Sequence, residues 1–121
     1  MDTATSYSYS NGAVISSDRV EGTSVYGTSG DKLGSIDTLM IDKLSGLVRY
    51  AVLEFGGFLG IGTDVYPLPW SMLKYDTNLD AYVVPVTKEQ LDDAPHYGRD
   101  NAPQYDPDYG RTVNSYYGIG W

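Results

Sequence analysis

The feature that most constrains the fold of this chain is a succession of short β-rich segments separated by turns about every ten residues. Several turns contain glycine, such as Gly30 before the second segment and Gly46 before the third. The predicted strands cover residues 24–26, 33–42, 47–55, 65–68, 74–76 and 81–84. Evenly spaced short strands are typical of small barrels. The sequence therefore predicts an all-β fold, a small six-stranded β-barrel.

Two of the predicted strands have distinctive patterns. In the strand 33–42 the apolar positions change phase after Ile36, which predicts a β-bulge near Asp37. The strand 47–55 is almost continuously apolar in its middle, and this pattern favours a central position in the sheet.

Two prolines constrain the next strand, 65–68. Pro67 and Pro69 cannot donate ladder hydrogen bonds, so this strand is expected at a sheet edge or at a crossing point. The segment 70–73, which follows directly, is interpreted as a single turn of helix.

Two helices are predicted near the C-terminus. Thr87 has Gln90 three residues later, the pattern of a capping box that opens a short helix. Asp106 followed by Pro107 is the pattern of an N-cap with proline at the first helical position, and it predicts a helix over residues 107–117. The side chains expected to share one face of that helix are Tyr109, Val113, Tyr116 and Tyr117.

These elements divide the chain into three parts. Residues 1–16 are rich in Ser, Thr, Tyr, Asn and Gly and are predicted to form a flexible arm. Residues 17–95 form the predicted barrel domain. Residues 96–121 form a tail rich in Tyr, Pro and Gly that contains the helix at 107–117.

The charge of the chain argues against nucleic-acid binding. The net charge is −8, and the eight Lys and Arg residues are scattered without any adjacent pair. Nucleic-acid and anionic membrane surfaces are bound mainly through clustered basic residues. No apolar run approaches the roughly 20 residues needed to span a bilayer. Residues 1–10 lack the basic and apolar regions of a signal peptide, so the expected location is the cytoplasm.

Candidate catalytic and metal sites are weak. The chain has no cysteine, which excludes disulfides, thiolate metal sites and a Cys nucleophile. The segment 76–80 resembles the start of an EF-hand loop, but Ala81 and Thr87 stand where that loop needs Gly and Glu, which favours a hairpin turn. No metal site, cofactor site or catalytic residue is predicted.

Three further ionisable residues are candidates for a site. His96 is the only histidine, and its place in a linker favours a surface position over a role as a base. Asp37 and Glu54 lie within apolar strands and are the acids to examine for raised pKa values. The alternative, outward-facing strand positions, is favoured for both.

The segment 56–62 is rich in glycine but lacks the Lys-Ser/Thr ending of a phosphate-binding loop. A hairpin tip explains its glycines, whereas its apolar side chains either fold back over the barrel or bind a partner. The predicted interaction residues are therefore Phe58, Leu59 and Ile61 of this loop and Tyr109, Val113, Tyr116 and Tyr117 of the tail helix.

The order of these motifs resembles the PRC-barrel family. The resemblance rests on three elements within residues 20–95, namely Gly34…Asp37, Asp42…Gly46 and Pro67-Leu68-Pro69-Trp70. PRC-barrel domains occur in the H subunit of photosynthetic reaction centres, at the C-terminal end of a ribosome maturation factor and as small bacterial proteins. The family is mostly non-catalytic, so the resemblance implies a β-barrel that acts by binding.

The function expected from the sequence is a non-enzymatic interaction or scaffolding module of the bacterial cytoplasm. It is expected to self-associate, as a homodimer, and to bind an unknown protein partner without nucleic-acid binding or membrane insertion. Two alternatives remain at this point: a soluble accessory subunit that packs on a membrane electron-transport complex, and an RNA-processing accessory. An enzyme ranks last because the sequence shows no catalytic constellation.

Overall fold

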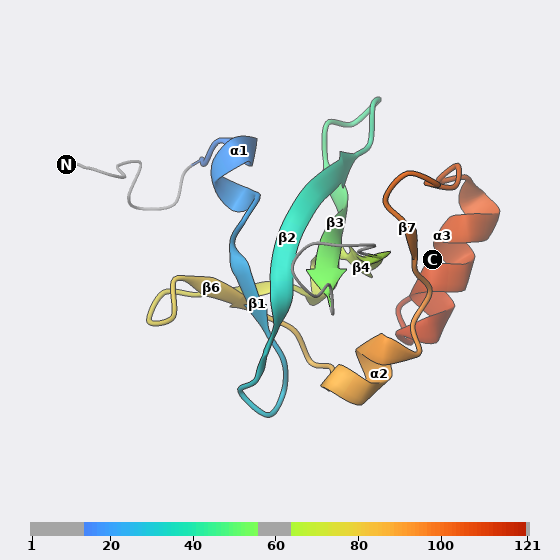
Figure 1. The fold of residues 1–121 in the computed structure, drawn as a ribbon. Helices are drawn as coiled ribbons and strands as arrows, with labels where there is room; N and C mark the ends of the chain where they lie inside the picture. Colours follow the sequence, from blue (N-terminus) through green and yellow to red (C-terminus); the bar gives the residue numbers. More distant parts are fainter. Residues whose placement is uncertain (1–13, 56–63, 121) are drawn as a thin grey trace.

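Seven strands form one sheet in residues 14–55 and 64–120, the part of the chain that the computed structural model describes (Figure 1). The strands are β1 (Ser24–Tyr26), β2 (Lys32–Ile41), β3 (Val48–Phe55), β4 (Asp64–Pro69), β5 (Lys74–Asp76), β6 (Ala81–Val83) and β7 (Tyr97–Gly98). Their order in the sheet is β5-β6-β1-β2-β3-β4-β7. The predicted all-β class is confirmed, and each predicted strand is present. The ladder in these residues ends at β5 and β7 rather than closing on itself.

The strand that the sequence analysis missed is β7, which is only two residues long. It pairs with the first two residues of β4, where Asp64 faces Gly98 and Val65 faces Tyr97. Beyond these pairs, β4 is paired only with β3 in the described sheet. Pro67 therefore lies where no second neighbouring strand needs its missing N–H group, in agreement with the predicted edge position.

Four short helical segments complete the described structure: α1 (Ser17–Val20), η1 (Trp70–Met72), α2 (Lys88–Asp92) and α3 (Pro107–Tyr116). At α2 the predicted capping box is present, because Thr87 N donates to Gln90 Oε1 over 2.8 Å and Gln90 N donates to Thr87 Oγ1 over 3.1 Å. The helix α3 lies within the predicted range 107–117. The predicted arm lies mostly outside the described residues, which begin at residue 14.

Both ends of α3 are set by local signals. Asp106 is the N-cap, and its Oδ1 accepts a hydrogen bond from Tyr109 N over 2.9 Å. At the other end Gly118 adopts a φ of 69°, and Ile119 N donates to Asn114 O over 2.8 Å. This pair of features is a Schellman-type stop, in which glycine takes the left-handed conformation that ends the helix.

The predicted bulge at Asp37 is also present. Along the β2–β3 ladder Ile36 faces Leu53 and Thr38 faces Val52, so Asp37 is the extra residue on β2. One extra residue changes which face the following side chains point to. As a result, Ile36 before the bulge and Leu39 after it, three positions apart, pack on the same core.

The strand β3 is buried on both of its faces. Alternation along a strand places Ala51, Leu53 and Phe55 on one face, within the main core cluster. Val52 lies on the opposite face and is also almost completely buried. The sequence pattern that favoured a central strand is thereby explained.

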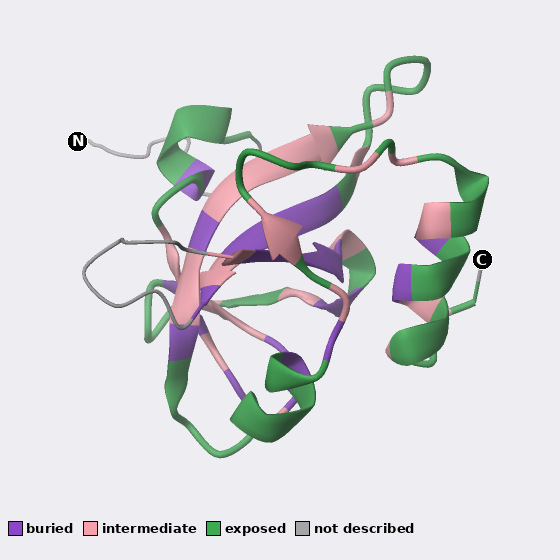
Figure 2. Cartoon of the chain, turned by 45° about the vertical axis from the view of Figure 1, so that its right-hand side comes forward, coloured by how far each residue is buried: buried purple, intermediate pink, exposed green. Residues whose placement is uncertain are grey.

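The second face of β3 is covered by the C-terminal segment of the same chain. Tyr50 on this face contacts the ring of Tyr105, with 5.4 Å between the ring centroids. From α3, Val113 is completely buried. Figure 2 shows the buried residues of α3 on the side of the helix that is turned toward the sheet. The tail therefore belongs to the folded unit as a second layer over β3 and β4.

The buried contact of α3 predicts a change in stability. Replacement of the completely buried Val113 by alanine should lower the free energy of unfolding by about 1–2 kcal/mol, because a large-to-small change in a core leaves a cavity. Replacement of Ser115, which is exposed on the same helix, by alanine is the matched control and should change it by less than about 0.5 kcal/mol. Urea denaturation followed by circular dichroism measures both. Equal midpoints for V113A and the wild type would contradict the packing described here.

Candidate functional site

The turn between β2 and β3, residues 42–47, is called here the hairpin tip. It is fixed by Asp42, whose Oδ1 accepts hydrogen bonds from Leu44 N and Ser45 N, each over 2.9 Å. These backbone hydrogen bonds, the one from Ser45 first, hold the pKa of Asp42 below its usual value. Gly46 closes the turn with a φ of 78°. The tip is therefore an ordered turn of defined shape, and it projects beyond the rest of the sheet (Figure 1).

This ordered turn, together with Ile41 at the end of β2 just before it, presents apolar side chains to solvent. Leu44 is 100% exposed, Leu47 is 65% exposed and Ile41 is 50% exposed. Single exposed apolar residues are common on proteins, but three large ones within seven positions form a local patch. Such patches on a folded surface are typical of sites where another molecule binds.

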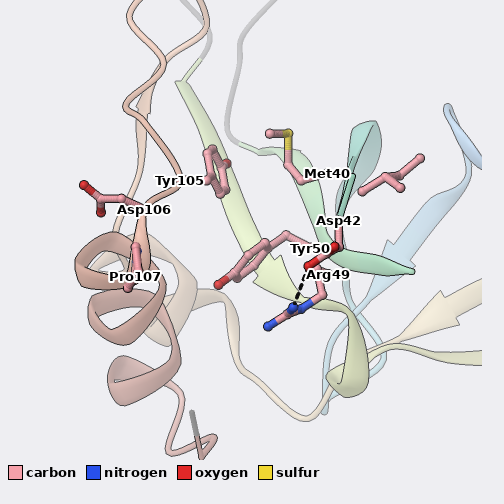
Figure 3. A pocket seen from close by; sticks show the side chains of 8 residues that line it. Met40, Asp42, Arg49, Tyr50, Tyr105, Asp106 and Pro107 are labelled. Atoms are coloured by element: carbon pink, nitrogen blue, oxygen red, sulfur yellow. Dashed lines mark hydrogen bonds and ion pairs between the residues drawn. The ribbon is translucent and has the colours of Figure 1, made fainter. Parts of the chain in front are cut away.

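A pocket of about 270 Å³ lies beside the hairpin tip, between the hairpin and the start of α3 (Figure 3). It is called here the hairpin pocket. Its lining consists of Met40, Ile41, Asp42, Arg49, Tyr50, Tyr105, Asp106 and Pro107. The walls are mainly apolar or aromatic, and the charged groups are two carboxylates and one guanidinium. Arg49 Nη1 lies 3.2 Å from Asp42 Oδ2, so this pair forms a salt bridge at the hairpin side of the pocket.

Two tyrosines of the pocket lining, Tyr50 and Tyr105, belong to a cluster of four that is called here the tyrosine cluster. It consists of Tyr50, Tyr97, Tyr105 and Tyr109. Tyr105 is central, with its ring centroid 5.4 Å from that of Tyr50 and 5.1 Å from that of Tyr109. Its hydroxyl shares a hydrogen bond with the hydroxyl of Tyr97. Burial raises the pKa of Tyr105 far above the usual value of a phenol. The cluster fixes the segment before α3 on β3.

A second link between the tail and the sheet is made by Arg99. Its Nη2 lies 3.0 Å from Asp37 Oδ1 and also hydrogen-bonds Glu54. Asp37 and Glu54 are the two acids that the sequence analysis singled out, and the structure places both beside this cation. The hydrogen bonds that Arg99 donates, to Glu54 first and then to Asp37, raise the pKa of Arg99. The sequence did not predict this pairing, because Arg99 lies 62 positions from Asp37 and 45 positions from Glu54 along the chain.

His96 occupies the connection between α2 and β7. It is exposed, as the sequence predicts, and its ring stacks on Tyr66 with 4.8 Å between the ring centroids. Nδ1 lies 2.8 Å from the carbonyl oxygen of Ala94, and Nε2 lies 3.5 Å from Asp64 Oδ2. These contacts tie the connection to the start of β4. The contacts of His96 are therefore structural, and they hold the connection to the sheet.

The hairpin-turn interpretation of the segment 76–80 agrees with the structure. Asp76 Oδ1 accepts hydrogen bonds from Asn78 N over 2.8 Å and from Leu79 N over 3.1 Å. The carboxylate is thus used by the turn between β5 and β6. Within the described parts of the chain there is no group of three or more His, Cys, Asp or Glu residues placed to hold a metal ion. None of the helices in those parts is both long and apolar enough to cross a membrane.

The predicted interaction residues have different fates. Phe58, Leu59 and Ile61 lie outside the described residues. The tail-helix residues lie against the same chain: Val113 is completely buried, Tyr109 and Tyr117 are partly buried, and Tyr116 is 40% exposed with its hydroxyl bonded to Gln90 O. Sequence reasoning missed the hairpin tip, because the sequence does not show whether an apolar residue in a short turn, such as Leu44, is buried or exposed.

Comparisons with known proteins agree with the fold. The family described as PRC-barrel domain matches residues 13–91. An uncharacterized protein from Deinococcus radiodurans is 26% identical over 81 residues, which are 67% of this chain and 28% of that protein. The chain therefore spans well under a third of the length of this relative. The family match ends before β7 and α3, so the tail lies outside it.

The tyrosine cluster predicts a pH-dependent stability. The hydroxyl of Tyr109 is buried without a hydrogen-bond partner among the described residues, and burial raises its pKa to about 12 from 10.0. A raised folded pKa means that stability is complete below pH 10, where both states are protonated, and falls as the pH rises toward 12. Replacement of Tyr109 by phenylalanine should therefore reduce that loss. At pH 7 it should stabilise the protein by about 1 kcal/mol, because it removes a buried polar group without a partner.

The matched control is Tyr105→Phe, which removes a hydroxyl that is hydrogen-bonded to Tyr97. This change should destabilise the protein by about 1 kcal/mol at pH 7. Urea denaturation at pH 7 and at intervals between pH 9 and 12 measures both variants. If Y109F were as destabilising as Y105F at pH 7, the assignment of an unpaired hydroxyl to Tyr109 would be wrong.

Proposed function

Because the chain belongs to the PRC-barrel family, we propose that it is a non-enzymatic interaction module that associates with itself through the hairpin tip. The observation that carries this proposal is the complete exposure of Leu44 on a turn that Asp42 holds in a fixed shape. A bacterial source is supported by the relative from Deinococcus radiodurans. The proposed location of this module is the cytoplasm. The PRC-barrel family is mostly non-catalytic, which supports binding rather than catalysis as the role.

The energetics of the hairpin tip suit association. Complete burial of one large aliphatic side chain is worth about 1.5–3 kcal/mol. Three such side chains, counted twice across a two-fold interface, offer a gain comparable to the roughly 4–15 kcal/mol that association costs. Ile41 and Leu47 are already partly covered, so their share is smaller than that of Leu44.

The fixed conformation of the turn adds to this gain in the free energy of association. Leu44 N and Ser45 N both donate to the same carboxylate oxygen of Asp42, and Asp42 N donates to Leu47 O over 2.8 Å. A segment that is already ordered loses little conformational entropy when it binds. An exposed leucine on such a turn is therefore a better anchor than one on a flexible loop.

The proposal predicts the mass of the protein in solution. Light scattering at about 100 micromolar, well above the micromolar range of weak but specific association, should give at least twice the chain mass of 13.3 kDa. Leu44→Asp should shift the protein toward the monomer. The matched control is Leu79→Asp, because Leu79 is 50% exposed on the β5–β6 turn, where Asp76 makes the same type of contact. A wild-type monomer at this concentration would contradict the proposed function.

A further inference from the structure

We propose that two copies of this chain pair reciprocally, with Leu44 of each hairpin tip inserted into the hairpin pocket of the other. This inference rests on the self-association proposed above and specifies its geometry. Its starting point is that the tip and the pocket lie side by side on one hairpin without filling each other. Leu44 is 100% exposed and does not line the pocket, whose hairpin wall is formed by residues 40–42 and 49–50.

The size of the hairpin pocket favours a side chain over a larger ligand. Its volume of about 270 Å³ lies just below the range of roughly 300–1,000 Å³ that is typical of sites for drug-sized molecules. One or two aliphatic side chains have a suitable volume to fill a cavity of this size. The exposed leucine beside the pocket of each copy is a side chain of that kind.

The walls of the pocket have the chemistry of a protein interface. Met40 is flexible and adapts to the shape of a partner. Tyr50 and Tyr105 offer large apolar rings that are already fixed by their mutual contact, with ring centroids 5.4 Å apart. Aromatic residues held in place bind at a small cost in entropy and are frequent among the residues that dominate binding energy. Figure 3 shows Met40 and Tyr50 on the hairpin side of the pocket and Tyr105 and Pro107 on the opposite side.

Charge complementarity identifies a second copy as the occupant. Lys43 is exposed directly beside Leu44 on the tip. Asp106 is exposed at the far rim of the pocket, where one of its oxygens caps α3 through Tyr109 N. A carboxylate can accept several hydrogen bonds, so Asp106 retains capacity for a cation. The tip thus presents a cation next to an apolar anchor. In the pocket, Arg49 is paired with Asp42, so Asp106 is the acid at the far rim beside the apolar cavity.

Two-fold symmetry follows from the arrangement. In an isologous pair the same two surfaces meet twice, so each copy supplies one tip and receives the other. Both contacts then form together, and no unfilled tip or pocket remains to recruit a third copy. The expected product is a closed dimer rather than a chain of subunits.

The test uses two variants with opposite charges. Leu44→Asp places a carboxylate on the tip and leaves the pocket intact. Pro107→Lys places an ammonium group at the pocket wall and leaves the tip intact. Pro107 is exposed at the first position of α3, so this change should not disrupt packing. Circular dichroism melting curves confirm that both variants fold.

Each variant alone should dimerise at least about tenfold more weakly than the wild type, a loss of at least 1.4 kcal/mol. An equimolar mixture should instead form the heterodimer, which native mass spectrometry distinguishes by mass. In the heterodimer one tip and pocket are both unchanged, and at the other contact the new carboxylate faces the new ammonium group. Leu79→Asp, on the other hairpin turn, should dimerise like the wild type.

The outcomes separate this inference from the function on which it rests. If both variants dimerise as strongly as the wild type, the reciprocal contact is wrong while self-association stands. If the variants are monomeric and their mixture remains monomeric, the reciprocal contact is also wrong. Growth of the wild type beyond the dimer as concentration rises would contradict the closed symmetry. A monomeric wild type would contradict the proposed function, self-association, and with it this inference.

Discussion

The strand β3 is buried on both faces, and this double burial determines how the tail is arranged on the sheet. One face of the strand carries Leu53 and lies in the core that the family domain provides. The other face carries Val52, which is equally buried. The residues that cover Val52 follow residue 91, where the family match ends. The cover for this face is supplied by Tyr105, which contacts Tyr50, and by α3 with its buried Val113. The tail is therefore required by the hydrophobic character of β3, since an open second face would expose a continuous apolar surface.

This use of the tail determines which surfaces remain for a partner. The aromatic side chains that made the tail look like a binding element are largely used inside the chain, as the contacts of Tyr105 and Tyr109 illustrate. The hairpin tip extends past the layer that the tail forms, and Leu44 is left without cover. The same segment that closes the second face also builds one wall of the hairpin pocket, through Tyr105 and Pro107. Folding and the proposed self-association thus share one structural element.

The sequence predicted the features that depend on neighbouring residues. The bulge at Asp37, the capping box at Thr87 and the N-cap at Asp106 all follow from local patterns, and all are present. Features that depend on distant contacts were not predictable in this way. The pairing of Arg99 with two strands and the two-residue strand β7 arise only once the tail docks. Exposure at the hairpin tip likewise depends on what the rest of the chain leaves uncovered.

Amide hydrogen exchange at two protein concentrations shows whether the tail covers β3 from within the chain and leaves the hairpin tip to a second copy. Exchange in β3 should be slow at both concentrations, because its cover is intramolecular. Amides of residues 40–47 and 105–106 should become more protected as concentration rises, while those of the β5–β6 turn should not change. Protection that does not depend on concentration at the tip, or that appears in β3 only at high concentration, would contradict this account.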